Sequence, residues 1–294
     1  MGKILIAGGS GFVGRNLKNH LEENGYEVYI LSTQMNKVGE YIFYWMPSQE
    51  VYNGNESFDF ETVINLAGAN IAEKFWTKSR KKELEDSRIL STKFLCKLIN
   101  DGKIKTNYFI QASAIGYYGN AKNQILTENS KLGSGFMAQL CDKWERAVSL
   151  DKIPFSIIRI SVVLDHKEGA YPKLMMTTPF CFAQVFDGGE AYLSWISSLD
   201  LSRFFLFLIE KKETGVYNAV SNTLTYRNFY KKHFEFHNKA FVLIPFPSFI
   251  FKFLLGDFSE IFLNSQRIEK SRILNDGFEF FEGSYEKFLA LPKN

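Results

Sequence analysis

The sequence contains little of what marks several large classes of protein. Only three of its 294 residues are cysteine, Cys96, Cys141 and Cys181, and their wide spacing fits neither a disulfide framework nor a metal site. Lys and Arg together number 35 against 32 Asp and Glu, so there is no large excess of positive charge to attract nucleic acid. No apolar run approaches the roughly 20 residues of a membrane span. We therefore expect no bound metal, no nucleic-acid partner and no membrane segment.

The same absences predict a cytoplasmic protein. Separated cysteines are typical of a reducing compartment, and the apolar run Lys3–Ala7 begins too early in the sequence for a signal peptide to precede it. The apolar stretch from 241 to 255 is interrupted by Pro245 and Pro247. We expect this stretch to form a loop that leads into a buried helix, because proline interrupts regular structure.

Apolar runs of strand length alternate with helical patterns over the first 160 residues. The expected strands are 3–7, 27–32, 41–45, 62–67, 107–112 and 155–160, and the expected helices are 13–24, 78–100 and 136–150. Such alternation predicts an α/β fold with a doubly wound parallel sheet and helices on both of its faces.

The pattern changes after about residue 165. Further helices are expected at 198–212, 225–236, 247–256 and 264–275. A short strand at 215–220 is expected to return to the sheet. The sequence therefore predicts a sheet domain over residues 1–165 and a smaller C-terminal lobe over 166–294 that is interleaved with it.

The strongest motif follows the first expected strand directly. Residues 8–14 read G-G-S-G-F-V-G, with glycines in the spacing G-x-x-G-x-x-G. Between a strand and an amphipathic helix, this spacing is typical of Rossmann dinucleotide sites, where the glycines allow a tight turn, close approach of a pyrophosphate and close helix packing. A plain glycine-rich turn is the alternative, while a P-loop is excluded because no Lys-Ser or Lys-Thr pair follows. The expected cofactor contacts are Gly8, Gly11, Phe12, Val13 and Gly14.

The end of the second expected strand indicates which dinucleotide is bound. NAD-binding proteins place Asp or Glu about 20 residues beyond the glycines, where the carboxylate holds the ribose hydroxyls. This chain has Leu31-Ser32-Thr33-Gln34 instead. The hydroxyls of Ser32 and Thr33 can donate to a 2′-phosphate, and no acid would repel it. We therefore expect NADP(H) rather than NAD(H), although the usual arginine is also missing and Lys37 is the nearest cation.

Three motifs occur in a characteristic order: G-G-S-G-F-V-G, then N-L-A-G-A-N at 65–70, then A-S-A-I-G-Y-Y-G at 112–119. Together they resemble the extended short-chain dehydrogenase/reductases, the NAD-dependent epimerase/dehydratase family. Further segments, among them I-A-E-K-F-W-T at 71–77 and L-C-D-K-W-E at 140–145, resemble an atypical epimerase-like subfamily labelled as cell-division inhibitors, which carries a short C-terminal domain of unknown function. The resemblance covers nearly the whole chain.

The resemblance implies roles for residues that follow the expected strands. Further cofactor contacts are implied at Leu66, Ala67, Gly68 and Ala112. Ser113 would place a hydroxyl near the nicotinamide, with a turn-forming role as the alternative. The residues implied to read the substrate are Asn70, Trp76 and Trp195. For both tryptophans, packing within the protein is the alternative.

The residue pair that moves a proton in the wider family is missing. Family members carry Y-x-x-x-K on the helix after the fifth strand, where the lysine lowers the pKa of the tyrosine so that the phenol can exchange a proton. Phe136 and Leu140 stand in these two places. Tyr117 and Tyr118 follow Ser113 closely enough to enter the same pocket, so the candidate catalytic residues are Ser113, Tyr117 and Tyr118. An unassisted phenol, with a pKa of about 10, is a poor acid at neutral pH, and tyrosines that only line the pocket are the alternative.

Two functions fit these observations. The first is an NADP(H)-dependent oxidoreductase or epimerase-like enzyme that acts on a small polar substrate, for which a sugar is one option. The second is a non-catalytic protein that binds or senses NADP(H). We favour the enzyme because Asn70 and the three candidate catalytic residues offer polar contacts. Analogy with the family also implies a homodimer formed through the helices at 78–100 and 136–150.

Overall fold

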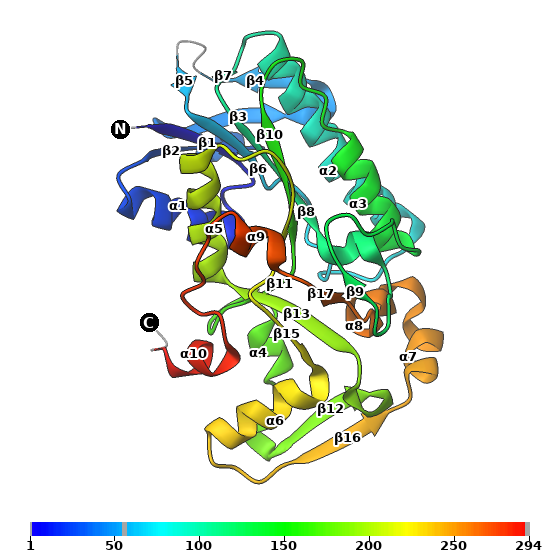
Figure 1. Cartoon of the computed structure of the whole chain (residues 1–294). Coiled ribbons are helices and arrows are strands. Elements are labelled where there is room, and N and C mark those ends of the chain that lie inside the picture. The colour runs from blue at the N-terminus through cyan, green and yellow to red at the C-terminus, as the bar shows by residue number, and fades with distance from the viewer. Residues whose placement is uncertain (1, 55–57, 292–294) are drawn as a thin grey trace. The chain divides into compact units, whose positions relative to one another are not determined.

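A computed structural model describes residues 2–54 and 58–291. In these residues, the largest sheet has eight strands in the order β14-β10-β8-β6-β1-β2-β3-β4 (Figure 1). The strands are β1 Lys3–Ala7, β2 Glu27–Ser32, β3 Ile42–Met46, β4 Val51–Asn53, β6 Thr62–Asn65, β8 Phe109–Ala114, β10 Phe155–Ile160 and β14 Gly215–Ala219. β1 pairs in parallel with β2 and β6, and β4 is the antiparallel edge. The predicted doubly wound parallel sheet is confirmed.

Two compact units make up the chain, and each is built from three stretches. The first contains Met1–Ser113, Leu140–Ile158 and Ser202–Tyr217, and the second contains Ala114–Gln139, Arg159–Leu201 and Asn218–Asn294. The strand expected at 215–220 does join the sheet, as β14 beside β10. The division of function at residue 165 stays a prediction.

The first unit follows from the apolar pattern of its strands. The central residues of β1 and β6 are buried, as expected for a parallel sheet that helices cover on both faces. α1 (Phe12–Glu23) and most of α5 (Ser198–Lys211) cover one face, and α2 (Lys78–Asn100) and most of α3 (Phe136–Arg146) cover the other (Figure 1). In α1, Leu17 and Leu21 face the sheet at helical spacing.

The second unit has an aromatic core beneath small sheets. One sheet joins β11 Val162–Leu164, β13 Tyr192–Ser197 and β15 Asn222–Thr225, and another joins β12 Phe182–Phe186 with β16 Val242–Phe246. α6 (Tyr226–Phe236) and α10 (Tyr285–Ala290) supply Phe229, Phe234 and Phe288 to the same core as Trp195 of β13. None of the helices within residues 2–54 and 58–291 has the length and apolar character needed to cross a membrane.

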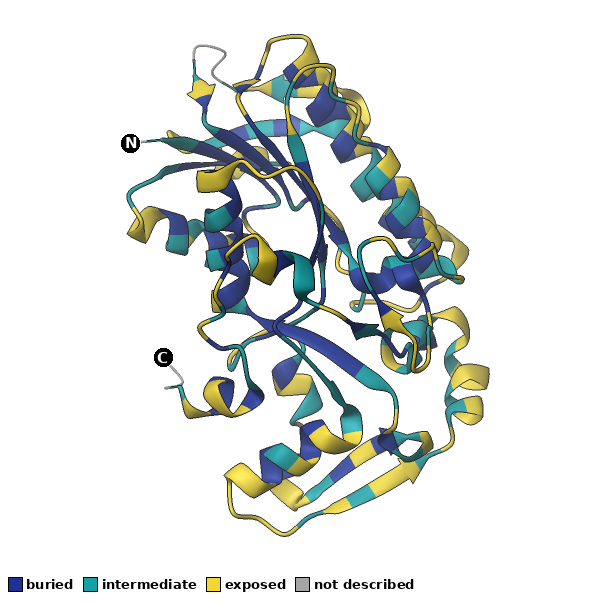
Figure 2. Ribbon diagram, viewed as in Figure 1, coloured by how far each residue is buried: buried dark blue, intermediate teal, exposed yellow. Residues whose placement is uncertain are grey.

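The helix expected at 247–256 does form, but its expected burial and the loop expected before it are wrong. Residues 242–246 form β16 instead of a loop, and α7 (Ser248–Leu255) is largely exposed (Figure 2). The side chains of Phe249 and Phe253 are 72% and 87% exposed. An apolar helix becomes buried only where another element covers its apolar face. Here α6 and α10 already fill the core of this unit.

The expected helix at 264–275 is only partly formed. β17 (Arg267–Ile268) pairs in parallel with β9 (Ile125–Leu126), and the helix α9 covers only Ser271–Asn275. The Gln266 side-chain amide donates to the carbonyl oxygens of Ile115 and Gly119, at 2.8 and 3.0 Å. These long-range bonds hold the segment extended, against a local preference for helix.

Candidate functional site

Of the three glycines in the G-x-x-G-x-x-G spacing after β1, one leaves room for a ligand and two do not. A Cβ atom on Gly8, whose φ is +82°, would lie 2.7 Å from the carbonyl carbon of Leu66, and one on Gly14 would lie 2.4 Å from the carbonyl oxygen of Gly8. A Cβ on Gly11 would meet only the Gly8 oxygen, at 3.4 Å. Gly8 and Gly14 are therefore needed for packing, whereas Gly11 presents bare backbone to open space.

The start of α1 suits a pyrophosphate. Gly11 is its N-cap and no side chain caps the helix, so the N–H groups of the first turn can bind an anion. Phe12 and Val13 begin this turn, and their contact with a cofactor stays a prediction. The open face at Gly11 and the uncapped helix start together fit the dinucleotide that the glycine spacing predicts.

The end of β2 carries the two hydroxyls expected to read the cofactor. Ser32 Oγ accepts a hydrogen bond from the backbone N–H of Gln34, at 3.1 Å, which leaves its own O–H able to donate. Thr33 and Lys37 are exposed nearby in the sequence. A role in selecting the 2′-phosphate stays a prediction.

The turn after β6 lies directly against the glycine turn. Asn65 is fully buried, donates to Thr92 Oγ1 and Gln111 Oε1, and accepts from the N–H of Ala67 at 3.1 Å. This network fixes the path of Leu66 and Ala67, which meet Gly8. No sequence pattern predicts the roles of Thr92 and Gln111, because they become neighbours of Asn65 only in the fold.

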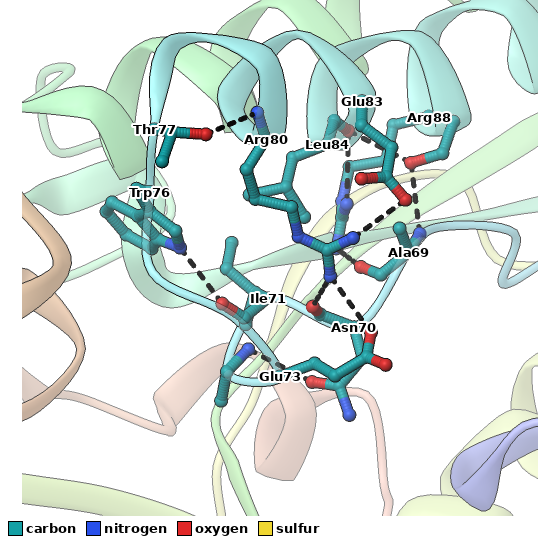
Figure 3. A network of polar contacts seen from close by, with 12 residues as sticks. Ala69, Asn70, Ile71, Glu73, Trp76, Thr77, Arg80, Glu83, Leu84 and Arg88 are labelled. Atoms are coloured by element: carbon teal, nitrogen blue, oxygen red, sulfur yellow. Dashed lines mark hydrogen bonds and ion pairs between the residues drawn. The ribbon is translucent and has the colours of Figure 1, made fainter.

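Arg80 holds the loop that follows (Figure 3). Its guanidinium donates to the carbonyl oxygen of Asn70 and pairs with Glu73 and Glu83. Trp76 is 8% exposed and its indole N–H donates to the Ile71 carbonyl oxygen at 2.9 Å, so its ring packs within the first unit. Asn70 is exposed, and its side-chain oxygen accepts from its own loop. Their substrate role stays a prediction.

Arg88 is a second α2 arginine beside the same loop (Figure 3). Its guanidinium donates to the carbonyl oxygens of Leu84 and Ala69, both at 3.1 Å, and lies 5.0 Å from the Trp144 ring centre. A Cβ on Gly68 would lie 3.0 Å from Arg88 Cζ. Burial lowers the pKa of Arg88 to about 10. Sequence reasoning missed this residue, and Gly68 is small to accommodate it.

Ser113, at the end of β8, has a partner that the sequence did not reveal. It is 2% exposed, and its hydroxyl donates to Glu145 Oε1 of α3 at 2.6 Å. Because the proton points to a carboxylate, the serine oxygen is left as an acceptor. Ala112, the preceding residue, is also buried. The structure thus places a carboxylate beside the candidate serine.

The two candidate tyrosines lie in the second unit beside a buried arginine. Tyr118 donates to Asn218 Oδ1 at 2.7 Å and accepts from Arg159 at 2.9 Å. Burial raises the pKa of Tyr118. The Arg159 guanidinium also lies 3.5 Å from the centre of the Tyr117 ring. These contacts favour a structural role for Tyr118, whereas Tyr117 is partly exposed.

At the two positions of the missing Tyr-x-x-x-Lys pair, Leu140 is packed in the core and Phe136 begins a helix. Leu140 is 1% exposed. α3 begins at Phe136, where the Glu260 carboxylate accepts from the N–H groups of Phe136 and Met137, at 3.0 and 3.1 Å. A carboxylate is favourable here because it meets the positive end of the helix. Neither Phe136 nor Leu140 offers a proton.

Trp195 lies in the aromatic core of the second unit. It is fully buried, and its ring centre is 5.9 Å from that of Tyr285 and 5.8 Å from that of Phe288. This burial favours the packing alternative for Trp195, and its substrate role stays a prediction.

The second unit also contains a cavity of about 760 Å³ that sequence reasoning missed. Its lining includes the aromatic residues Tyr192 and Tyr226 and the polar residues Asn120, Ser134, Glu190 and Ser265. Sites for small molecules have this size and this mixture of apolar faces with a few polar groups. The lining residues come from distant parts of the sequence, so no local motif predicts this cavity. In the part of the chain that the structure describes, no cluster of His, Cys, Asp and Glu suits a metal ion.

Comparison with known proteins identifies a family and relatives that are similar to this sequence. Residues 4–139 match the model of the NAD dependent epimerase/dehydratase family. An epimerase family protein of Mycobacterium leprae is 30% identical over 98% of this chain and 94% of its own length. The chloroplastic SDR39U1 homologue of Arabidopsis thaliana, also an epimerase family protein, is 30% identical over 94% of this chain and 82% of its own.

Solved structures show the same fold. The human epimerase family protein SDR39U1 (isoform 2), crystallised with NADPH, superposes with a TM-score of 0.86 and 24% identity over 97% of both chains. A nucleoside-diphosphate sugar epimerase from Corynebacterium glutamicum gives a TM-score of 0.76 and 25% identity. It covers 98% of this chain and 57% of that one.

Proposed function

Because the chain belongs to the NAD dependent epimerase/dehydratase family, we propose that it binds NADP(H) and acts as an oxidoreductase or epimerase-like enzyme on a small polar substrate. The observation that carries the proposal is the glycine turn, in which Gly8 and Gly14 pack against backbone while Gly11 faces open space. A bound nicotinamide would supply hydride chemistry. The chain's own part is to hold the dinucleotide along Gly8–Gly14, Ser32–Thr33 and Leu66–Gly68.

The preference for the phosphorylated cofactor rests on the end of β2. Ser32 and Thr33 offer two hydroxyl donors where an acid would repel a 2′-phosphate. That the human neighbour was crystallised with NADPH supports the same choice. The cavity in the second unit supports a small polar substrate, since its aromatic and polar lining would suit a sugar-like molecule.

Titration of the purified protein with NADPH and NADH tests the cofactor. We expect NADPH to bind more tightly by about tenfold or more, because charge-assisted hydrogen bonds to a phosphate are strong. The double variant Ser32→Ala, Thr33→Ala should bind NADPH more weakly, which reduces the difference between the two affinities, and should leave NADH binding unchanged. Quenching of tryptophan fluorescence measures both affinities, and tighter binding of NADH would contradict the proposal.

Tyr117 is the residue that we propose to exchange the substrate proton. Of the three candidate catalytic residues, Ser113 is 2% exposed and Tyr118 is 3% exposed, whereas Tyr117 is only partly buried. Arg159 lies over its ring and fixes its position. Ser113 and Glu145, whose hydrogen bond ties β8 to α3, would position the end of that strand.

Replacing Tyr117 separates catalysis from packing. Tyr117→Phe should lower any turnover by about 100-fold, the usual contribution of a positioned acid or base, without changing NADPH affinity. Tyr118→Phe is the matched control, which should lower the free energy of unfolding by about 1–3 kcal/mol, because Asn218 and Arg159 lose a buried partner. Screening carbonyl substrates at the NADPH absorbance gives the rates. Full activity of Tyr117→Phe would remove it as the acid.

A non-catalytic NADP(H)-binding or sensing protein is the second candidate. Its support is the pair Phe136 and Leu140, neither of which can move a proton. Tight NADPH binding without turnover in the same substrate screen would favour this function.

A further inference from the structure

Arg88 differs from Arg80, its neighbour on α2, in how its charge is compensated. Arg80 pairs with two carboxylates, those of Glu73 and Glu83. The hydrogen bonds of Arg88 go to the carbonyl oxygens of Leu84 and Ala69, and within residues 2–54 and 58–291 no carboxylate pairs with it. Burial lowers the pKa of Arg88 to about 10, which still leaves it charged at neutral pH. The first unit therefore retains a partly buried cation that two carbonyl oxygens and the face of the Trp144 ring compensate in place of a carboxylate, so that its net charge remains for a ligand to use.

The guanidinium of Arg88 lies directly against Gly68. Arg88 Cζ would touch a Cβ placed there, at 3.0 Å, and Gly68 directly follows the Leu66–Ala67 segment that meets Gly8. Arg88 therefore lies next to the segment that contacts the glycine turn. All of these residues lie in the first unit.

The strand order shows which half of a dinucleotide would face Arg88. β1 lies between β2 and β6, and β8 follows β6. In this fold the pyrophosphate crosses the end of β1 and the adenosine ribose is read from the end of β2. The nicotinamide half therefore extends toward the ends of β6 and β8. Arg88 stands at the end of β6, on that side.

We propose that Arg88 is the fixed positive charge of the nicotinamide half of the site and that it makes the protein bind NADPH more tightly than NADP⁺. The inference rests on the proposed binding of NADP(H). An oxidised nicotinamide ring carries a positive charge and the reduced ring is neutral, so a fixed cation repels only the oxidised form. Two carbonyl bonds hold the guanidinium in place, and a guanidinium has five N–H donors, so others can donate to ribose oxygens.

The test compares three ligands, NADPH, NADP⁺ and 2′,5′-ADP, which lacks the nicotinamide half. Calorimetry gives the affinity of each for the wild type, for Arg88→Gln, which loses the charge but keeps a polar side chain, and for Arg88→Lys, which keeps the charge. Lys143→Met is the matched control, because Lys143 pairs with Glu85 across the same two helices, α2 and α3, but at an exposed position.

We expect the wild type to prefer NADPH over NADP⁺ by about fivefold or more, because a fixed positive charge beside the nicotinamide pocket repels the cationic ring even in a partly aqueous site. Arg88→Gln should bring this ratio close to one while its affinity for 2′,5′-ADP stays within twofold of the wild type. Arg88→Lys and Lys143→Met should keep the ratio.

Three results would overturn the inference: a wild-type ratio near one, an unchanged ratio in Arg88→Gln, or an equal loss of 2′,5′-ADP binding, which would indicate a structural role. Failure of the wild type to bind any of the three ligands would instead refute the proposed cofactor site itself, and the role of Arg88 with it.

Discussion

Gly11→Val should weaken NADPH binding by about 100-fold or more while leaving the protein folded. The backbone at Gly11, with φ −74° and ψ 172°, is allowed for valine, and a Cβ would meet only the Gly8 oxygen at 3.4 Å. The protein therefore accepts the side chain, and a pyrophosphate that must approach this backbone does not. A loss of 100-fold corresponds to about 2.7 kcal/mol of binding free energy.

Gly14→Val is the control, in which we expect the stability of the fold to fall because the new side chain clashes with backbone. Its Cβ would lie 2.4 Å from the Gly8 carbonyl oxygen and 2.6 Å from Gly9 Cα, so backbone must move and the free energy of unfolding should fall by about 1–3 kcal/mol or more. Thermal melts and NADPH titrations of both variants separate the two effects. Binding by Gly11→Val within threefold of the wild type would contradict the cofactor cradle.

Asp200→Ala should destabilise the second unit by about 2–6 kcal/mol. Asp200 is fully buried, and its carboxylate accepts from the backbone N–H groups of Phe281 and Glu282, both at 2.8 Å. The variant leaves these two donors without their partner, at about 1–3 kcal/mol each. A second effect opposes this loss. Burial raises the pKa of Glu282 and the charge of Asp200 raises it further, so removal of Asp200 relieves a repulsion between the two carboxylates. The relief of that repulsion is smaller than the loss of two charge-assisted bonds.

Urea unfolding measures the loss, and hydrogen exchange locates it at residues 281 and 282. Asp187→Ala is the matched control, since Asp187 also accepts a backbone N–H, that of Ser248 at 2.9 Å, but is exposed. We expect Asp187→Ala to change the free energy of unfolding by less than about 1 kcal/mol. Equal effects of the two substitutions would show that the buried bonds do not hold the C-terminal segment.

Local signals made the first unit predictable. The turn after β1 combines a strand, a glycine spacing and a helix start within about 20 residues, so its geometry is encoded in one stretch of sequence. The bounds of α2 at Lys78 and Asn100 also agree with the sequence, because Thr77 is an N-cap residue whose side chain accepts from the N–H of Arg80.

Long-range contacts explain what was missed. Glu145 meets Ser113 across 32 positions, and Arg88 reaches the carbonyl of Ala69 across 19. Neither pairing has a periodic or spacing signal, because each depends on how a helix packs on the sheet. The error at α7 has a related cause: hydropathy measures how favourable burial of a segment would be, while burial itself requires a neighbour.

The cap on α3 ties the order of synthesis to the order of folding. Glu260 closes the first turn of α3 although it follows Phe136 by 124 positions. As the chain leaves the ribosome, this helix therefore emerges without its cap and stays frayed at its first turn until the C-terminal part has been made. The start of α3 is thus among the last parts of the second unit to become ordered in a newly made chain.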